Sequence, residues 1–267
     1  MDLSIDAKRG RRIFSLAAPI LVAMLTQNLI NIVDTIYIGK LDPAYSIPGQ
    51  AALGFSLPLY WSIGAFLAAI SVGTQATTAR RFGGGDETGA GSTLTNALSV
   101  GLLSAATFTA VGWFIVPLVY PLLTSNPSVL ELGIPYTRIR IAAIIPMVCT
   151  FAFKGFFDGL GHTRVHMYAS LVMNAVNIVL NYVFIFGMGP IPAMYVTGAG
   201  IASALSTGVG LVAMAAWSLR GKYREQFEYY RLENLDPKMM CTLVKRSAPS
   251  GTADILMMSG GLFILTT

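Results

Sequence analysis

Polar side chains recur at helical spacing inside two long apolar segments of the sequence. Gln27, Asn31 and Asp34 lie four and three residues apart, so they would share one face of a helix. A carboxylate at the middle of a bilayer costs on the order of 3 kcal/mol or more, so Asp34 is expected to face other polar groups. A carboxylate beside amide oxygens suits a hard cation such as sodium, and a carboxylate held away from water also permits reversible protonation. These residues predict a cation or proton site.

The second apolar segment carries a matching stripe of asparagines. Asn174, Asn177 and Asn181 are three and four residues apart, again on one helical face. We expect the two stripes to face each other or a water-filled cavity. The alternative is that the amides only hold helices together, as Asn and Ser commonly do in membranes. That alternative is weaker for Asp34, because a carboxylate is costlier to bury than an amide.

The segments that would position these stripes are long enough to cross a membrane. Only 12% of the 267 residues are charged, against about 25% in a soluble domain. Hydrocarbon offers the backbone no partner outside its own segment, so each apolar run is predicted to be helical. The predicted fold is therefore an all-α, polytopic membrane helix bundle. Its six spans are expected at residues 13–39, 50–79, 88–116, 130–155, 165–187 and 196–219, and a further apolar run starts near Cys241.

The basic residues lie at the ends of the apolar runs. All 18 Lys and Arg except Lys40, Arg138 and Arg140 fall on the side of the N-terminus, which predicts a cytoplasmic N-terminus. The protein is thus expected to be a multi-pass protein of the cell membrane, of the bacterial inner-membrane type, with the lipid bilayer as its surroundings. The net charge of +5 forms no basic face interleaved with aromatic residues, so no nucleic-acid partner is expected.

Prolines lie within several spans, where each removes a backbone hydrogen bond. Pro19 and Pro146 are predicted to act as helix hinges, a feature that alternating-access carriers use. Membrane helices are also enriched in proline and glycine without any such role.

Other patterns that could carry chemistry are weak. Asp158, His162 and His166 are four residues apart, but Gly159 and Gly161 interrupt the helix between them, so no metal site is expected there. No nucleophile–base pair is visible either, so the protein is not expected to be an enzyme or to carry a cofactor. The one metal ion that these residues would suit is sodium at Asp34.

One long polar stretch divides the chain. Residues 220–236 interleave charged residues with Tyr and Phe, which predicts an amphipathic helix on the inner membrane surface. The predicted organisation is a six-helix transmembrane lobe at residues 1–219, a cytoplasmic inter-lobe linker at 220–240, and the truncated start of a second lobe, with a seventh helix, at 241–267.

Five stretches across essentially all of the chain have the order and spacing of a known family. They are residues 18–20 (API) with 32–41 (IVDTIYIGKL), 71–75 (SVGTQ) with 81–86 (RFGGGD), 159–164 (GLGHTR), 177–187 (NIVLNYVFIFG) and 198–203 (GAGIAS). Through these stretches the sequence resembles the multidrug and toxic compound extrusion (MATE) family of ion-coupled antiporters.

The resemblance implies a two-lobe carrier of twelve helices that opens alternately to each side. In that family the first lobe binds a proton or sodium ion at the position of Asp34, with partners that match Asn177, Asn181, Tyr136 and Ser203. Some members carry a second Asp where this chain has Asn181, so the choice between proton and sodium stays open. A second lobe is expected in the same full-length chain, of which this sequence would be a fragment; the alternative is that two copies of the chain pair.

The expected function is antiport that exports organic, often cationic, drugs or toxic compounds in exchange for protons or sodium ions. The alternative is a lipid-linked precursor flippase of a related fold. A flippase would need a wide basic cavity for pyrophosphate, for which Arg138 and Arg140 are the candidates in the fourth span.

Overall fold

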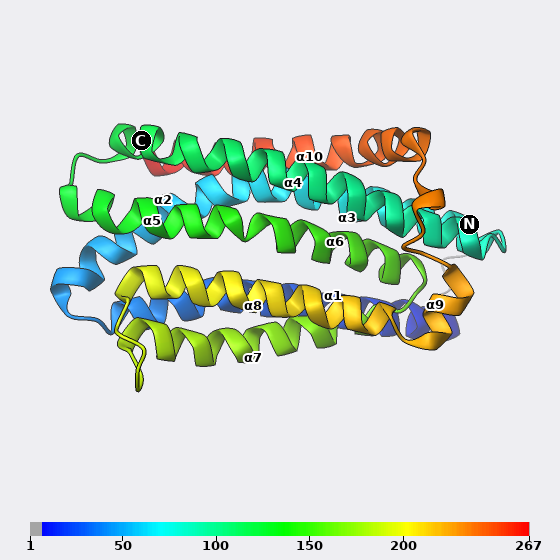
Figure 1. The fold of residues 1–267 in the computed structure, drawn as a ribbon, viewed down its shortest axis with the longest axis horizontal. Coiled ribbons are helices and arrows are strands. Elements are labelled where there is room, and N and C mark those ends of the chain that lie inside the picture. Colours follow the sequence, from blue (N-terminus) through cyan, green and yellow to red (C-terminus); the bar gives the residue numbers. More distant parts are fainter. Residues whose placement is uncertain (1–6, 267) are drawn as a thin grey trace.

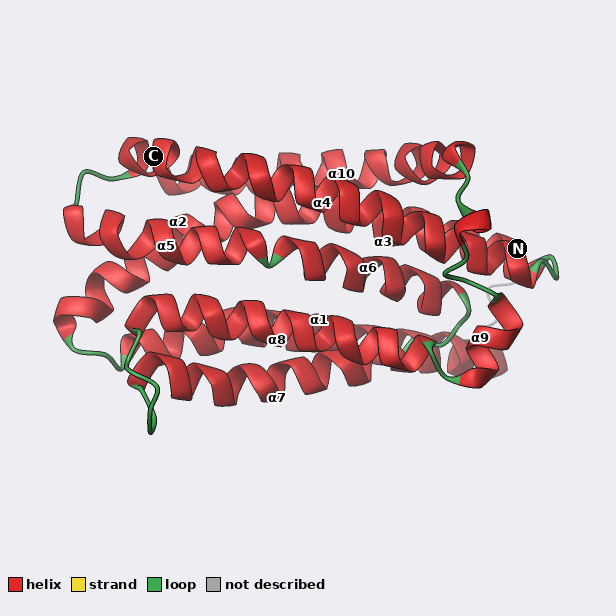
Figure 2. Ribbon diagram, in the orientation of Figure 1, coloured by secondary structure: helices red, strands yellow, loops and turns green. Residues whose placement is uncertain are grey.

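The computed structural model describes residues 7–266, and the side chains of residues 7–9, 12, 27, 254–255 and 257–266 lie outside the described part. Helices account for nearly all of that part (Figures 1 and 2). They are α1 (Ala7–Gly39), α2 (Pro43–Ala68), α3 (Ile70–Gly83), α4 (Glu87–Leu123), α5 (Pro127–Ala142), α6 (Ile144–Gly159), α7 (Arg164–Phe186), α8 (Tyr195–Ser218), α9 (Gly221–Phe227), the 3-10 helix η1 (Leu232–Asn234) and α10 (Pro237–Thr266).

Capping residues explain where several helices begin. The Asp42 carboxylate accepts a hydrogen bond from the Ala44 amide at 3.0 Å, and the Asp86 carboxylate accepts one from the Gly89 amide at 2.9 Å. Asn126 does the same for the Ser128 amide at 3.0 Å. Each side chain satisfies a backbone donor that has no partner within the helix.

Six stretches of the described chain are long and apolar enough to span a membrane, which confirms the predicted number of spans. The first span, Ile13–Gly39, has the predicted bounds. The other five differ from the prediction and run over Pro43–Gly83, Glu87–Leu123, Pro127–Gly159, Arg164–Phe186 and Tyr195–Ser218. Large apolar side chains cover the outside of the bundle; Phe114, Leu118 and Leu122 on α4 are more than two-thirds exposed. An apolar surface of this kind is stable in lipid and not in water.

Two of the spans consist of two helices each, where single helices were predicted. The fourth span breaks at Ala143, between α5 and α6. Pro146 has no N–H to donate to the Ala142 carbonyl, four residues earlier, so it removes one hydrogen bond at the break. The second span breaks at Ala69, between α2 and α3. By contrast, α1 continues through Pro19 as one helix.

The long helices lie roughly parallel (Figure 1). Helices α1, α7 and α8 pack together along one side, and α3, α4 and α10 lie along the other, with α5 and α6 between them. The turns that join α3 to α4 and α6 to α7 lie at the same end of the bundle as α9 (Figure 1). This is the end that the Lys and Arg distribution predicts to be cytoplasmic.

The segment after α8 differs from its prediction. It forms the seven-residue helix α9, which ends where Glu228 takes a left-handed conformation (φ 48°), and then a short strap through η1. Phe227 and Tyr229 are buried against Phe156 of α6. The prediction of one amphipathic helix across 220–236 is therefore wrong, because Phe227 and Tyr229 pack into the bundle and the chain turns there.

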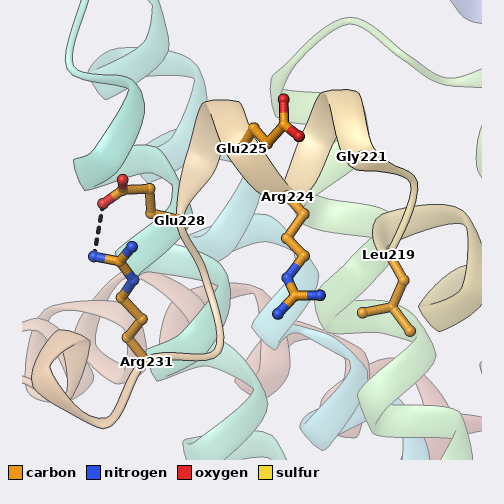
Figure 3. Close-up of a pocket in the computed structure, with 6 residues that line it drawn as sticks. All are labelled: Leu219, Gly221, Arg224, Glu225, Glu228 and Arg231. Carbon is orange, nitrogen blue, oxygen red and sulfur yellow. Dashed lines mark ion pairs between the residues drawn. The ribbon is translucent and has the colours of Figure 1, made fainter.

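The charged side chains of this linker face outward. Arg224, Glu225, Glu228 and Arg231 surround a hollow of about 630 Å³ that lies beside Leu219 and Gly221 (Figure 3). Arg231 and Glu228 form an ion pair at 3.0 Å there, and both side chains are about half exposed. Exposed pairs of this kind contribute about 0–1 kcal/mol.

Candidate functional site

Asp34 is fully buried near the end of α1, and both of its carboxylate oxygens accept hydrogen bonds from other helices. Its Oδ1 accepts from Asn181 Nδ2 at 2.8 Å, and its Oδ2 accepts from Ser203 Oγ at 2.7 Å. Asn181 belongs to α7 and Ser203 to α8, so one carboxylate joins three helices. The structure thus brings together residues from three of the segments that the sequence singled out.

Asn177 completes the polar chain. Asn181 Nδ2 also donates to Asn177 Oδ1 at 3.0 Å, and Asn177 Nδ2 donates to Ser203 Oγ at 3.2 Å. Asn177 and Asn181 are one helical turn apart on α7 and both are fully buried. Asp34 of α1 therefore faces the part of the α7 stripe that carries Asn177 and Asn181.

A close approach of α7 and α8 makes these contacts possible. Gly198 lies where a Cβ atom would collide with the backbone carbonyl of Phe184. Farther along α8, a Cβ on Gly200 would come within 3.1 Å of the Tyr136 ring. Small residues at the crossing let the helices pack tightly enough for Ser203 to reach Asp34.

Arg140 is the charged partner of this cluster. Its Nη1 lies 3.9 Å from Asp34 Oδ2, and its Nη2 donates to Asn31 Oδ1 at 3.0 Å. The guanidinium also sits 4.5 Å from the centre of the Tyr60 ring, where a cation is attracted to the aromatic face. The side chain of Arg140 is 5% exposed and that of Asp34 is fully buried, so this ion pair is held away from solvent.

From the sequence, Arg140 was a candidate only for the basic cavity of the flippase alternative, and no connection with Asp34 was predicted. The signal that could have indicated this connection is the spacing of Tyr136 and Arg140, which are four residues apart and hence on one face of α5. Tyr136 is buried within electrostatic range of both Arg140 and Asp34. The Tyr136 hydroxyl and Arg140 Nε have no hydrogen-bond partner among the described residues.

The supporting polar residues divide into three cases. Asn31 joins the cluster through Arg140. Asn174 is buried, but its amide donates to the Ser170 carbonyl on its own helix at 3.0 Å, and it makes no hydrogen bond to Asp34. The side chain of Gln27 lies outside the described residues.

The weaker motifs do not converge. Asp158 pairs with Lys154 at 2.8 Å, whereas His162 Nδ1 shares a hydrogen bond with the Tyr223 hydroxyl at 3.1 Å. Partial burial lowers the pKa of His162, and the nearby charge of Lys222 lowers it further. Among the residues that the structure describes, no group of three His, Cys, Asp or Glu side chains is placed to hold a metal ion.

The arrangement around Asp34 is electrically neutral when the carboxylate is ionised. One carboxylate faces one guanidinium, and the remaining partners are amides and a hydroxyl. Neutralising the carboxylate would leave the guanidinium without a balancing charge. A change in the charge of Asp34 would therefore change the energy of its contacts with α5, α7 and α8. A single ionisation event can thereby alter the packing of four helices.

Comparisons with known proteins agree with the resemblance. A family model described as MatE matches residues 19–183. The chain is 28% identical over 251 residues to a probable multidrug resistance protein NorM of Geobacillus kaustophilus, covering 92% of this chain and 53% of that protein. It is 26% identical over 245 residues to the multidrug resistance protein PmpM of Pseudomonas aeruginosa, covering 91% of this chain and 50% of that protein.

The fold is similar to solved structures at a comparable level of identity. A crystal structure of a MATE protein in its bent conformation superposes with a TM-score of 0.84 at 27% identity, covering 96% of this chain and 55% of that one. The chain thus spans about half the length of the relatives it matches.

Proposed function

The chain belongs to the MatE family of membrane transporters, and on that basis we propose that it forms one lobe of a secondary antiporter that exports organic, often cationic, compounds. The exported compound leaves in exchange for a proton or a sodium ion that binds at Asp34. Two relatives described as multidrug resistance proteins support drug-like compounds as the substrate class. A second lobe would form the other wall of the transport pathway.

The observation that carries the proposal is the burial of Asp34 among partners from other helices. A carboxylate placed there costs several kcal/mol to desolvate, so its retention needs a reason. Its hydrogen bonds to Asn181 and Ser203 tie α1 to α7 and α8. Binding of a cation or proton would weaken or redirect those bonds, and the lobe would then favour a different packing of α1.

The flippase alternative loses its structural support. Arg138 Nε donates to the Trp113 carbonyl of α4 at 3.0 Å, and the guanidinium stacks over the Trp113 ring at 5.3 Å. Arg140 instead pairs with Asp34. The two arginines therefore do not line a shared cavity that could accept a pyrophosphate.

The test uses the full-length transporter in proteoliposomes with an imposed proton or sodium gradient. We expect Asp34→Asn to abolish gradient-driven uptake of a fluorescent organic cation, because the amide can neither release a proton nor attract a cation. Asp42→Asn is the matched control, since Asp42 caps α2 outside the cluster and Asn caps equally well. Equal gradient-driven flux in wild type and Asp34→Asn would defeat the proposal.

A further inference from the structure

We propose that the guanidinium of Arg140 takes the place of a bound sodium ion at the Asp34 site. The site then binds a proton and not sodium. The inference rests on the proposed coupling role of Asp34 and adds the identity of the ion. It assigns to Arg140 a specificity-determining role.

The groups that face Asp34 support this role. The titratable groups that face it are Arg140 and Tyr136 from α5, with Tyr60 from α2 and Tyr120 from α4 packed around them. Helices α7 and α8 contribute amides and a hydroxyl only. Within the described residues Arg140 is therefore the one positive charge against the one negative charge. A sodium ion or a proton added to this pair leaves the same net positive charge, so the two ions differ in the space and the ligands that each needs. Arg140 already occupies one oxygen that sodium could use, because its Nη2 donates to Asn31 Oδ1 at 3.0 Å.

The atoms that surround the carboxylate also favour a proton over sodium. A carboxylate can only accept hydrogen bonds, so the amide of Asn181 must turn its nitrogen toward Asp34 and the hydroxyl of Ser203 must turn its hydrogen. Asn177 is then fixed as well, because its oxygen accepts from Asn181 and its nitrogen faces Ser203. A hard cation needs several oxygen atoms directed at one point. Here donors surround the carboxylate, and sodium would have to reverse them.

A proton adds the same charge as a sodium ion, but it needs no coordination sphere and no space beside the guanidinium. It bonds to either carboxylate oxygen and gives a neutral acid. The guanidinium of Arg140 then keeps only Asn31 and the Tyr60 face as partners. An uncompensated buried cation is costly, so α5 is driven to shift relative to α1 or to admit water. Proton uptake thus destabilises the present packing of α5 against α1.

The experiment follows proton release and uptake by the purified full-length protein in weakly buffered detergent solution, with a pH-sensitive dye. In wild type, addition of NaCl should release no more protons than addition of KCl, while an acid titration shows one proton taken up that Asp34→Asn lacks. In Arg140→Gln, NaCl should displace that proton. Arg140→Lys keeps the tethered charge and should stay insensitive to sodium, with an apparent sodium affinity at least about tenfold weaker than in Arg140→Gln.

Two results would overturn the inference. One is sodium-specific proton release in wild type that disappears in Asp34→Asn, because sodium would then bind beside Arg140. The other is an Arg140→Gln protein that still takes up the Asp34 proton yet ignores sodium. If Arg140→Gln fails to fold, the titrations of wild type and Arg140→Lys still test the inference, because proton release on addition of NaCl in either protein would contradict it. These titrations read the ion at the site without any transport, so a failure of the antiport proposal leaves them interpretable.

Discussion

The buried pair of Asp34 and Arg140 makes a quantitative prediction about stability. The perturbation is a double-mutant cycle of Asp34→Asn, Arg140→Met and the two combined. Asn keeps the size of the carboxylate and an acceptor oxygen for Ser203, and Met keeps much of the apolar length of Arg against Tyr60. Each single change therefore removes chiefly one charge.

The expected magnitude follows from the distance and the burial of the pair. Two unit charges 3.9 Å apart attract by about 4 kcal/mol at an effective dielectric constant of about 20. Removing one member of a buried pair costs about 3–5 kcal/mol, because the other charge stays buried without compensation. Removing both leaves no such charge. The double variant should therefore be more stable than the sum of the two single effects predicts, by about 3 kcal/mol.

The assay is reversible unfolding in mixed micelles with a rising fraction of denaturing detergent, followed by tryptophan fluorescence at pH 8. Asp42→Asn combined with Arg140→Met is the control, and it should be additive because Asp42 makes its contact at the start of α2. A coupling free energy below about 0.5 kcal/mol between positions 34 and 140 would refute the reasoning, since independent sites add to within that margin. It would mean that the two groups do not interact as charges.

Two further predictions concern the linker and the helix break. Asn96→Ala removes the hydrogen bonds that join α4 to the linker, from Asn96 to the Asn234 carbonyl (2.7 Å) and from the Asp236 amide to Asn96 (2.8 Å), so trypsin should cut after Arg231 about 10–30-fold faster. Ser104→Ala loses only contacts within α4 and should leave the cleavage rate unchanged. Equal cleavage rates in the two variants would show that Asn96 does not hold the linker in place. Pro146→Ala supplies an N–H for the Ala142 carbonyl and should slow amide hydrogen exchange at residues 143–147. The expected gain in local stability is about 1 kcal/mol, because packing retains part of the bend. Unchanged hydrogen exchange would mean that packing alone causes the break.

Residue types and their spacing were sufficient for much of the site. The stripe of Asn177 and Asn181 could be read from the helical period, and the cost of burying Asp34 indicated that this carboxylate would face a polar partner. The family resemblance added Ser203, which has no distinguishing local pattern of its own. The structure places these residues in hydrogen-bond contact, while their role in transport stays a proposal.

Other features could not be predicted because they depend on contacts between remote residues. The pairing of Arg140 with Asp34 requires a particular rotation of α5 about its axis, and nothing near Arg140 in the sequence fixes that rotation. The linker aromatics were expected to face lipid, yet Phe227 and Tyr229 find a pocket beside Phe156 that exists only once α4, α6 and α8 have packed. The break at Ala69 could not be predicted either, because no proline lies near it in the sequence.

The sequence by itself determined the number of membrane-crossing segments, their helical character and the face on which Asp34 lies. Those properties are local, because apolar length and a period of 3.6 residues act within one segment. The tertiary structure alone decided which faces meet, and with that the charge balance of the site. Electrostatic energy depends on distances of a few ångströms between side chains more than 100 positions apart, such as Asn31 and Arg140.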